Sequence, residues 1–361
     1  MLNMKNSHII VGISGGVDSA VAAYLLKEAG HKIEGVFMKN WEGDDTEHDC
    51  HDAIHLADAE VICDQLKIDL QVVNFSDRYW QHVFSYFLDE YRAGRTPNPD
   101  VLCNKEIKFK AFLDYAKGRG AHKIATGHYA RLQPHHTHIN LLKGTDLSKD
   151  QSYFLHLLNQ SQLAHSLFPV GHLKKQEVRH LAKAIGLKNH AKKDSTGICF
   201  IGERPFKTFL NHYLPSQSGM IETLQGEVIG QHDGLMFYTI GQRKGLNIGG
   251  LKGKAELPWY VAQKDLKRNV LTVVQDEMHP ALFKKELIAS NLHFIQMRPT
   301  FPFKTFAKIR YRQHDQACLL EEMTNKQYRV IFDKPQRAIT PGQAIVFYQD
   351  DICLGGGMIE S

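Results

Sequence analysis

A glycine-rich turn stands between a strand and a helix near the start of the chain. Residues 8–13 form an apolar run typical of a buried parallel strand, and residues 14–19 (Ser-Gly-Gly-Val-Asp-Ser) follow it directly. Residues 20–26 then have helical composition. In this order the free N–H groups and the positive dipole end of the helix point into the turn. The sequence therefore predicts a phosphate-binding unit; the plainer alternative is a solvated turn before an ordinary helix.

The turn carries an aspartate where kinase-type phosphate loops carry a lysine. It lacks their Gly-Lys-Ser/Thr ending, so no lysine of the turn is placed to reach a terminal phosphoryl group. A carboxylate beside phosphates requires a bridging cation, and Asp18 therefore predicts Mg²⁺. The segment resembles the pyrophosphate loop of the ATP pyrophosphatases, which split ATP between its α- and β-phosphates and leave an adenylated intermediate.

Length, charge and cysteine spacing limit the class of protein. A chain of 361 residues predicts two or three domains, and a formal net charge of +5 permits an RNA partner without requiring one. No apolar stretch is long enough to span a bilayer and residues 1–5 contain no signal-peptide core, so we expect a cytoplasmic protein with no membrane partner. The six cysteines include no Cys-x-x-Cys pair, which argues against zinc or iron–sulfur ligand sets, and we assign no metal-ligand residues.

The two halves of the chain differ in pattern. The first half alternates strand-like and helical runs, which predicts an α/β domain whose parallel sheet binds ligands at the carboxyl ends of its strands. After about residue 211, short alternating runs between turn residues predict two small β-barrels, and we place the domains at 1–210, 211–276 and 277–361. The expected strands are residues 8–13, 33–38, 70–75, 123–127, 226–229, 235–240, 259–261, 270–274, 306–311, 328–332 and 344–348. The expected helices are residues 17–29, 54–66, 78–91, 106–117 and 174–185.

Cys103 lies in an unusual proline-containing stretch. Pro97 and Pro99 are expected to exclude helix from residues 95–104 and to hold the chain extended, with a helix starting near Glu106. Cys103 is then just ahead of a helix N-terminus, whose dipole favours a thiolate together with two nearby lysines. The alternative is that Cys103 is a small buried residue.

Cys199 is the other cysteine in a reactive context. It follows residues 194–197 (Asp-Ser-Thr-Gly) and has basic residues on both sides, so the residues alone support a thiolate and a structural role equally. Cys63 falls on an apolar helical face and Cys353 in a closing strand, and we expect both to be buried.

A longer set of motifs resembles one family from about residue 8 to the C-terminus. The runs are GISGGVDS, FMKNW, AGRTPNPDVLCNKEIKF, ATGHYAR, KDQSYFL, FPVG, KKDSTGICFIGER, GQRKGL, PWYV and TPGQ. They are similar to those of the bacterial tRNA-specific 2-thiouridylases, members of the ATP pyrophosphatase superfamily. In that family ATP adenylates the C2 oxygen of the wobble uridine in the tRNAs for Lys, Glu and Gln, releasing pyrophosphate. A cysteine persulfide then supplies sulfur, and AMP departs to leave 2-thiouridine.

The resemblance implies roles for residues of this chain. Cys199 would carry the persulfide and Cys103 would complete the transfer, either as an acid or by attacking the inner sulfur to give a disulfide. Asp100 would accept or donate a proton of the base. The implied contacts are Asn98, Pro99 and Asp100 with the target base; Gly12, Ile13, Ser14, Gly15, Gly16, Val17, Asp18, Ser19, Met38 and Gly127 with ATP; and Lys149, Asp150, Gln151, Arg310, Tyr311 and Arg312 with tRNA.

The resemblance also implies partners. The family takes its sulfur from a cysteine desulfurase, often through a sulfur-relay protein, so either is an expected partner. We also expect a monomer.

Two segments have weaker interpretations. His51 and His55 have metal-ligand spacing on a helical pattern, but the glutamate of a zinc-protease helix is absent, which disfavours a metal site. Residues 42–49 are acidic and are expected to form a mobile loop after the second strand.

Two rival functions also fit the phosphate turn. Another adenylating synthetase, acting on a metabolite, would leave the two loop cysteines and the β half without a role. A non-catalytic ATP- or RNA-binding module predicts that Cys103→Ser and Cys199→Ser have no effect.

Overall fold

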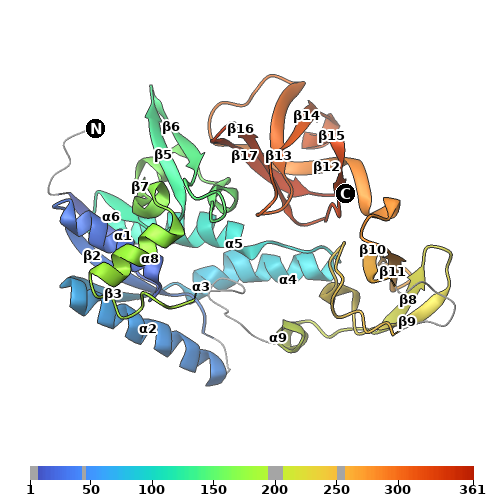
Figure 1. Ribbon diagram of the computed structural model, residues 1–361, viewed down its shortest axis with the longest axis horizontal. Helices are drawn as coiled ribbons and strands as arrows, with labels where there is room; N and C mark the ends of the chain where they lie inside the picture. Colours follow the sequence, from blue (N-terminus) through green and yellow to red (C-terminus); the bar gives the residue numbers. More distant parts are fainter. Residues whose placement is uncertain (1–6, 43–45, 194–205, 250–256) are drawn as a thin grey trace.

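The computed structural model describes residues 7–42, 46–193, 206–249 and 257–361, and of residues 46–52 only the backbone. Figure 1 shows an α/β unit on the left, a β-barrel at the upper right and a smaller β unit at the lower right. Within the described ranges, no helix has both the length and the apolar character needed to cross a membrane.

Five parallel strands form the sheet of the α/β unit, in the order β3-β2-β1-β4-β7. This confirms the predicted parallel α/β domain. The strands are β1 (His8–Gly12), β2 (Lys32–Lys39), β3 (Asp69–Asn74), β4 (Lys123–Ala125) and β7 (Ser166–Leu167). Because β1 is the central strand, the turn that follows it opens in the middle of the carboxyl edge, between the ends of β2 and β4.

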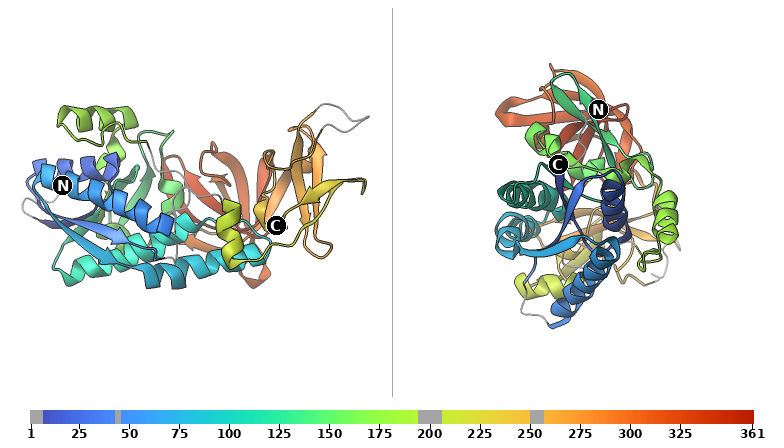
Figure 2. Two further views of the ribbon diagram at one scale, coloured as in Figure 1. Left: turned by 90° about the horizontal axis from the view of Figure 1, so that it is seen from below. Right: turned by 90° about the vertical axis from the view of Figure 1, so that its left-hand side faces the viewer.

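Helices cover both faces of this sheet, as the right-hand view of Figure 2 shows. On one face Ile9 and Val11 of β1 pack with α1 (Val17–Glu28), α2 (Thr46–Leu66) and α8 (Lys175–Ala184). Ile10 points to the opposite face, since successive side chains of a strand alternate, and packs there with two longer helical segments. These are α3 (Ser76–Tyr79), π-helical Trp80–Phe84 and α4 (Ser85–Arg92), then α5 (Pro99–Leu102), π-helical Cys103–Ala111 and α6 (Phe112–Gly118).

Helix α2 begins earlier than the sequence pattern predicts. Residues 46–49, expected to belong to a mobile acidic loop, form its first turn, and that expectation is wrong for them.

A β-hairpin extends from the α/β unit to the barrel. It consists of β5 (Ala130–His135) and β6 (His138–Lys143), and β6 pairs with the last strand of the chain, Leu141 opposite Cys353. The chain then returns through a three-ten helix (Ser152–Leu155), α7 (Gln160–Ala164) and a second three-ten helix (Pro169–His172). Backbone pairing therefore makes the hairpin and the barrel one continuous sheet.

The smaller β unit follows α9 (Phe206–Tyr213), where Phe209 packs against Trp41 of the α/β unit with ring centroids 6.0 Å apart. Its sheet has the order β10-β11-β8-β9. The strands are β8 (Gly219–Thr223), β9 (Val228–His232), β10 (Trp259–Asp265) and β11 (Val270–Gln275). The strand expected at 235–240 is wrong: Leu235–Phe237 is a three-ten helix, because a short apolar run alone does not distinguish strand from helix.

Six strands close into a barrel at the end of the chain. Their order is β12-β15-β14-β13-β16-β17, and β17 pairs back with β12. They are β12 (Phe283–Phe294), β13 (Phe303–Lys308), β14 (Gln316–Glu322), β15 (Gln327–Arg337), β16 (Ala344–Gln349) and β17 (Ile352–Ile359). The strand expected at 306–311 ends at Lys308, so residues 310–312 occupy the turn after it.

Candidate active site

The glycine-rich turn between β1 and α1 is folded as the sequence predicts. Ser19 Oγ donates to the Gly16 carbonyl at 3.1 Å and accepts the Ser14 N–H at 3.2 Å, so side chains of the turn hold its shape. Gly15 has a φ of +71°, and a Cβ there would lie 2.6 Å from the His55 carbonyl oxygen of α2. Glycine is therefore required at this position both by conformation and by space.

A lysine from a distant helix meets the aspartate of this turn. Lys175, the first residue of α8, places its Nζ 2.8 Å from both carboxylate oxygens of Asp18. The Tyr129 hydroxyl donates to Asp18 Oδ1, also at 2.8 Å. The turn itself contains no lysine, and Lys175 lies 157 positions further along the chain. No local pattern could have indicated this pairing.

Two further side chains pack behind the turn. Asn189 Nδ2 donates to the Gly15 carbonyl at 3.3 Å. Lys192 Nζ lies 2.5 Å from Asp58 Oδ2 and 3.0 Å from His55 Nδ1, both on α2. These contacts fix the turn against α2 and against the segment that follows α8.

Met38 and Gly127 lie on either side of the turn, near the ends of β2 and β4. A Cβ on Gly127 would come within 2.7 Å of the main-chain carbon of Asp18, and one on Gly12 within 3.1 Å of Met38 Cε. The expected ATP contacts are thus brought to one edge of the sheet, where the strand ends approach the start of α1 closely.

A histidine beside this edge is held neutral. His128 Nδ1 lies 2.8 Å from Thr126 Oγ1, and its ring packs against those of Phe109 and Phe168, with centroids 5.7 and 6.0 Å away. Burial, reinforced by the charge of nearby Lys108, lowers the pKa of His128 well below the ordinary value. The sequence pattern gave this residue no role, although it falls in the ATGHYAR run.

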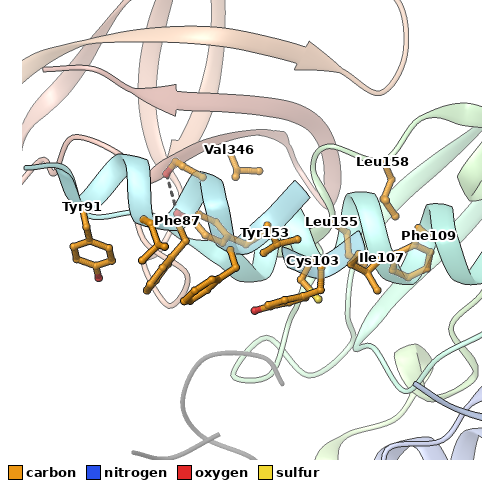
Figure 3. Packing of buried hydrophobic residues seen from close by; sticks show 14 of the residues in the cluster. Phe87, Tyr91, Cys103, Ile107, Phe109, Tyr153, Leu155, Leu158 and Val346 are labelled. Atoms are coloured by element: carbon orange, nitrogen blue, oxygen red, sulfur yellow. Dashed lines mark hydrogen bonds between the residues drawn. The ribbon is translucent and has the colours of Figure 1, made fainter. Parts of the chain in front are cut away.

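Cys103 lies inside a helix rather than ahead of one. The helical segment begins at Pro99, with Asn98 extended before it, so the expectation of extended chain through residue 104 is wrong. Proline fits the first helical position, where its missing N–H costs no hydrogen bond. Cys103 follows one turn later and is fully buried; Figure 3 shows it in a row of buried side chains with Ile107 and Tyr153.

The helix adopts π geometry from Cys103 onward. Gln162 Nε2 donates to the carbonyls of Lys105 and Phe109, at 3.2 and 2.9 Å, and so supports two successive turns. Asn104 is buried, and its Oδ1 has no hydrogen-bond partner among the described residues. Short π-helical segments are frequent at functional sites.

The second cysteine of the predicted pair, Cys199, lies outside the described residues, so its approach to Cys103 stays a prediction. Cys63 and Cys353 are buried as expected, and burial raises the pKa of each thiol to about 12. Cys318 is also buried, with its thiol pKa raised to about 12 for the same reason. These three thiols stay protonated at neutral pH and are poor nucleophiles.

A cavity of about 460 Å³ lies between the start of the Cys103 helix and the barrel. It brings together Asn98 and Asp100, expected to contact the target base, with the turn at 310–312, expected to contact tRNA. Pro99 is buried and sets the start of the helix. The lining residues are Asn98, Asp100, Phe154, Thr239, Arg310, Tyr311, Arg312, Thr340 and Gln343.

Contacts across this cavity join the proline stretch to the barrel. Gln343 Nε2 donates to the carbonyls of Thr96 and Pro97, at 2.7 and 3.3 Å. The ring centroids of Phe154 and Tyr311 lie 4.5 Å apart. Aromatic rings can stack on a nucleic-acid base. Phe154 and Gln343 were not predicted, and their only signal is that they fall in the KDQSYFL and TPGQ runs.

The expected tRNA contacts differ in how far they face solvent. Arg312 is exposed and Lys149 half-buried. Arg310 donates to two main-chain carbonyls, one in the smaller β unit and one in the barrel, and Gln151 accepts a main-chain N–H. The carboxylate of Asp150 is buried and accepts two main-chain N–H groups and a serine hydroxyl. Contact between the Asp150 side chain and RNA would require it to leave these partners.

Among the side chains that the structure describes, no group of three or more His, Cys, Asp or Glu could hold a metal ion. His55, which has metal-ligand spacing with His51, lies against the Lys192 ammonium. The side chain of His51 is outside the described part.

A parallel α/β unit with a pyrophosphate-type turn at its carboxyl edge, followed by a small β unit and a closed barrel, places the chain in the class of ATP-pyrophosphatase-like proteins with an appended β half. Family models match each part. They are the tRNA methyl transferase HUP domain at residues 7–203, the tRNA methyl transferase PRC-barrel domain at 207–275 and the aminomethyltransferase beta-barrel domain at 284–359.

Curated relatives match nearly the whole chain. The Colwellia psychrerythraea protein named tRNA-specific 2-thiouridylase MnmA is 55% identical over 362 residues, covering 99% of this chain and 96% of that protein. The Coxiella burnetii protein of the same name is 57% identical over 356 residues, covering 98% of each. The chain therefore belongs to the tRNA-specific 2-thiouridylase family.

Solved structures show weaker likeness. A 4-thiouridine synthetase in complex with RNA and bound ATP is 17% identical, with a TM-score of 0.34 over 58% of this chain and 50% of that one. The NMN synthetase from Francisella tularensis is 18% identical, with a TM-score of 0.33 over 53% and 67%. Likeness at this level supports no conclusion about this chain.

Proposed function

We propose that this protein is a tRNA 2-thiouridylase, which adenylates the C2 oxygen of the wobble uridine of the tRNAs for Lys, Glu and Gln and replaces that oxygen with sulfur. The geometric observation that carries the proposal is the cavity joining Asn98 and Asp100 to the barrel turn at 310–312. It lies at the start of the helix that contains Cys103. Membership of the 2-thiouridylase family supports the same activity.

The first step activates a poor electrophile. The uridine O2 lone pair forms a bond to the α-phosphorus of ATP, and the bond to the α,β-bridging oxygen breaks, so pyrophosphate leaves with that electron pair. Residues 12–19, with Met38 and Gly127, would hold the nucleotide at the carboxyl edge of the sheet. Asp100 would accept or donate a proton of the base.

The second step delivers sulfur. The terminal sulfur of a Cys199 persulfide attacks C2, and AMP leaves with the former carbonyl oxygen. Cys103 then either supplies a proton while an external thiol attacks Sγ of Cys199, or attacks that Sγ itself. In both cases the electron pair of the broken S–S bond stays on the new C2 sulfur, and in the second case a Cys103–Cys199 disulfide forms. That disulfide requires an external thiol reductant before the next turnover.

Because Cys103 is buried, the site must open before its thiol can supply a proton or attack Cys199. The base must also leave the anticodon stack to reach the cavity, as in other enzymes that act on a single base. Phe154 and Tyr311 would receive the splayed nucleotide, while Lys149 and Arg312 would contact phosphates. Asn98 and Asp100 would contact the base edge. Buried Pro99, which sets the start of the helix, would fix their positions.

Mg²⁺ would accompany ATP mainly through phosphate oxygens. The described residues of the turn offer one carboxylate, Asp18, and both its oxygens contact Lys175. The hydroxyls of Ser14 and Ser19 are further oxygen donors that suit this ion.

The proposal also covers the location, oligomeric state, sulfur donor and domain boundaries of the protein. We infer a cytoplasmic protein that acts as a monomer and receives sulfur from a cysteine desulfurase or a relay protein. Domain boundaries near residues 210 and 276 belong to the same proposal.

The test is the 2-thiouridine content of tRNA from cells that lack the protein, measured by mass spectrometry. We expect the modification to disappear, to return with the wild-type chain and with Cys353→Ala, and to stay absent with Cys103→Ser or Cys199→Ser. Cys353 is the matched control because it is an equally buried cysteine that does not line the cavity. Unchanged thiolation in the deleted cells would overturn the proposal.

A further inference from the structure

The carboxylate of the phosphate turn is in contact with a cation of the chain itself. Lys175 Nζ lies 2.8 Å from both oxygens of Asp18, and the same Nζ lies 5.7 Å from the centre of the Tyr129 ring. The Lys175 side chain is 10% exposed and that of Asp18 30%. The pair is therefore mostly shielded from water, on the side where α8 packs against α1 (Figure 1).

The rest of the fold holds this lysine in place. The main-chain N–H of Lys175 donates to Asp146 Oδ2 at 2.9 Å, which anchors the start of α8. Tyr129 follows β4 and donates to the same carboxylate that the lysine contacts. Asp18 lies in the first turn of α1, which is the end of the helix that points at the turn. The start of α8 therefore holds the stem of Lys175 beside the predicted phosphate site.

Charge explains why a cation is needed at this point. The N–H groups of the α1 N-terminus attract an anion, but the Asp18 carboxylate in the same turn repels one. An ammonium that contacts both carboxylate oxygens cancels that repulsion. Lysine suits the task because its charge is compact and its stem is flexible, so Nζ can move from a carboxylate oxygen to a phosphate oxygen without movement of the helix.

We propose that Lys175 is the cation that receives the pyrophosphate leaving group, an inference that rests on the proposed function. When uridine O2 bonds to the α-phosphorus, the electron pair of the broken P–O bond passes to the bridging oxygen and adds negative charge to the departing pyrophosphate. The Lys175 ammonium stabilises that charge and keeps its proton throughout. A positive charge that is already in place where negative charge develops can contribute much of an enzyme's rate enhancement, because it stabilises the transition state.

The test is binding of inorganic pyrophosphate to the full chain by isothermal titration calorimetry, with and without Mg²⁺. Lys175→Met is expected to weaken pyrophosphate binding about tenfold to hundredfold, as for loss of a hydrogen bond to a charged group. Lys175→Arg keeps the charge and is expected to retain most of the affinity. Lys174→Met is the matched control, because Lys174 is the exposed neighbour and the change in net charge is the same.

A second variant, Asp18→Asn, tests the same site and does not depend on whether Lys175→Met folds correctly. Asp18→Asn removes the competitor for the ammonium, so without Mg²⁺ it is expected to bind pyrophosphate several-fold more tightly than the wild type. Wild-type affinity in Lys175→Met, or weaker Mg²⁺-free binding in Asp18→Asn, overturns the proposal. Neither measurement involves RNA or sulfur. Failure of the proposed function itself would appear instead as unchanged 2-thiouridine in tRNA from the deleted cells.

Discussion

Lys308 of the barrel places its ammonium 3.5 Å from the buried carboxylate of Asp150, in the segment that follows β6. Asp315 lies 3.7 Å from the same ammonium and also contacts Lys143 of β6. Both ammonium groups lie over the ring of Tyr348, 4.8 and 4.9 Å from its centre. This neutral cluster of two cations and two anions joins the α/β unit to the barrel, so Asp150 fixes the relative position of the two walls of the cavity.

The first prediction concerns this cluster. Lys308→Met leaves Asp150 buried without its cation, and breaking a buried pair in this way is expected to cost about 3 kcal/mol in the free energy of unfolding. Urea denaturation followed by fluorescence measures the loss. Glu286→Gln, which breaks the exposed pair with Arg329, is the control and is expected to cost less than about 1 kcal/mol. Equal stability of the two variants would show that the cluster contributes nothing.

The second prediction concerns pH. His156 is buried and its ring contacts the Tyr153 carbonyl through Nδ1 at 2.7 Å; burial lowers its pKa to about 4. The unfolded chain therefore binds more protons than the folded one between pH 6.5 and 4, so stability is lost as pH falls through this window. For this group alone the loss is about 3 kcal/mol.

His156→Asn tests that prediction, because asparagine keeps a donor for the Tyr153 carbonyl but does not titrate. Urea denaturation at pH 7 and pH 4 should show a smaller loss of stability for His156→Asn than for the wild type. His136→Asn, at an exposed position, should match the wild type at both values. If the three proteins lose stability equally, buried His156 is not the source of the pH dependence.

The third prediction concerns the aromatic pair in the cavity. Tyr311→Ala removes a ring that can stack a nucleotide, and loss of such stacking is expected to weaken tRNA binding by about 1–3 kcal/mol. Tyr311→Phe keeps the ring but loses the hydroxyl contact with the Lys149 carbonyl, so it should bind almost as the wild type does. Fluorescence anisotropy with tRNA at one fixed salt concentration measures both. Equal weakening in both variants would assign the effect to the hydroxyl.

Local sequence patterns were sufficient to predict the phosphate turn and the strand and helix on either side of it. The strand, turn and helix that surround Ser14 and Asp18 depend on apolar periodicity and on turn chemistry within about twenty residues. The pattern failed at Pro99, where the rule that proline breaks helices outweighed the rule that proline fits the first helical turn. It also failed at residues 309–311, because apolar and polar residues can alternate past the last paired residue of a strand.

Long-range pairs could not be predicted in this way. Lys175 and Asp18 are 157 positions apart, and Gln343 and Thr96 are 247 apart. Each contact exists only because the sheet order and the barrel bring these segments together. The resemblance to known motifs indicated which runs matter, but it gave no role to Lys175 or Gln343.

The last prediction concerns Gln343, which connects the barrel to the proline stretch. Its Nε2 donates to the carbonyls of Thr96 and Pro97, the two residues that directly precede Asn98 of the cavity lining. Gln343→Leu keeps the approximate volume but leaves both carbonyls without this donor, so Asn98 and Asp100 lose their fixed position. We expect the KM for tRNA to rise about tenfold, as for loss of about 1.4 kcal/mol of binding. The KM for ATP should stay unchanged, because the phosphate turn lies on another element.

Steady-state kinetics with each substrate varied separately measure the two constants, and Gln343→Glu serves as the matched variant. Glutamate has the shape of glutamine but presents acceptors to two carbonyls, so it should impair tRNA binding at least as much as leucine does. A variant that merely loosened the barrel would raise both KM values and lower the midpoint of unfolding. A rise confined to tRNA, at unchanged stability, is the result that a positioning role requires; a rise confined to ATP would contradict it.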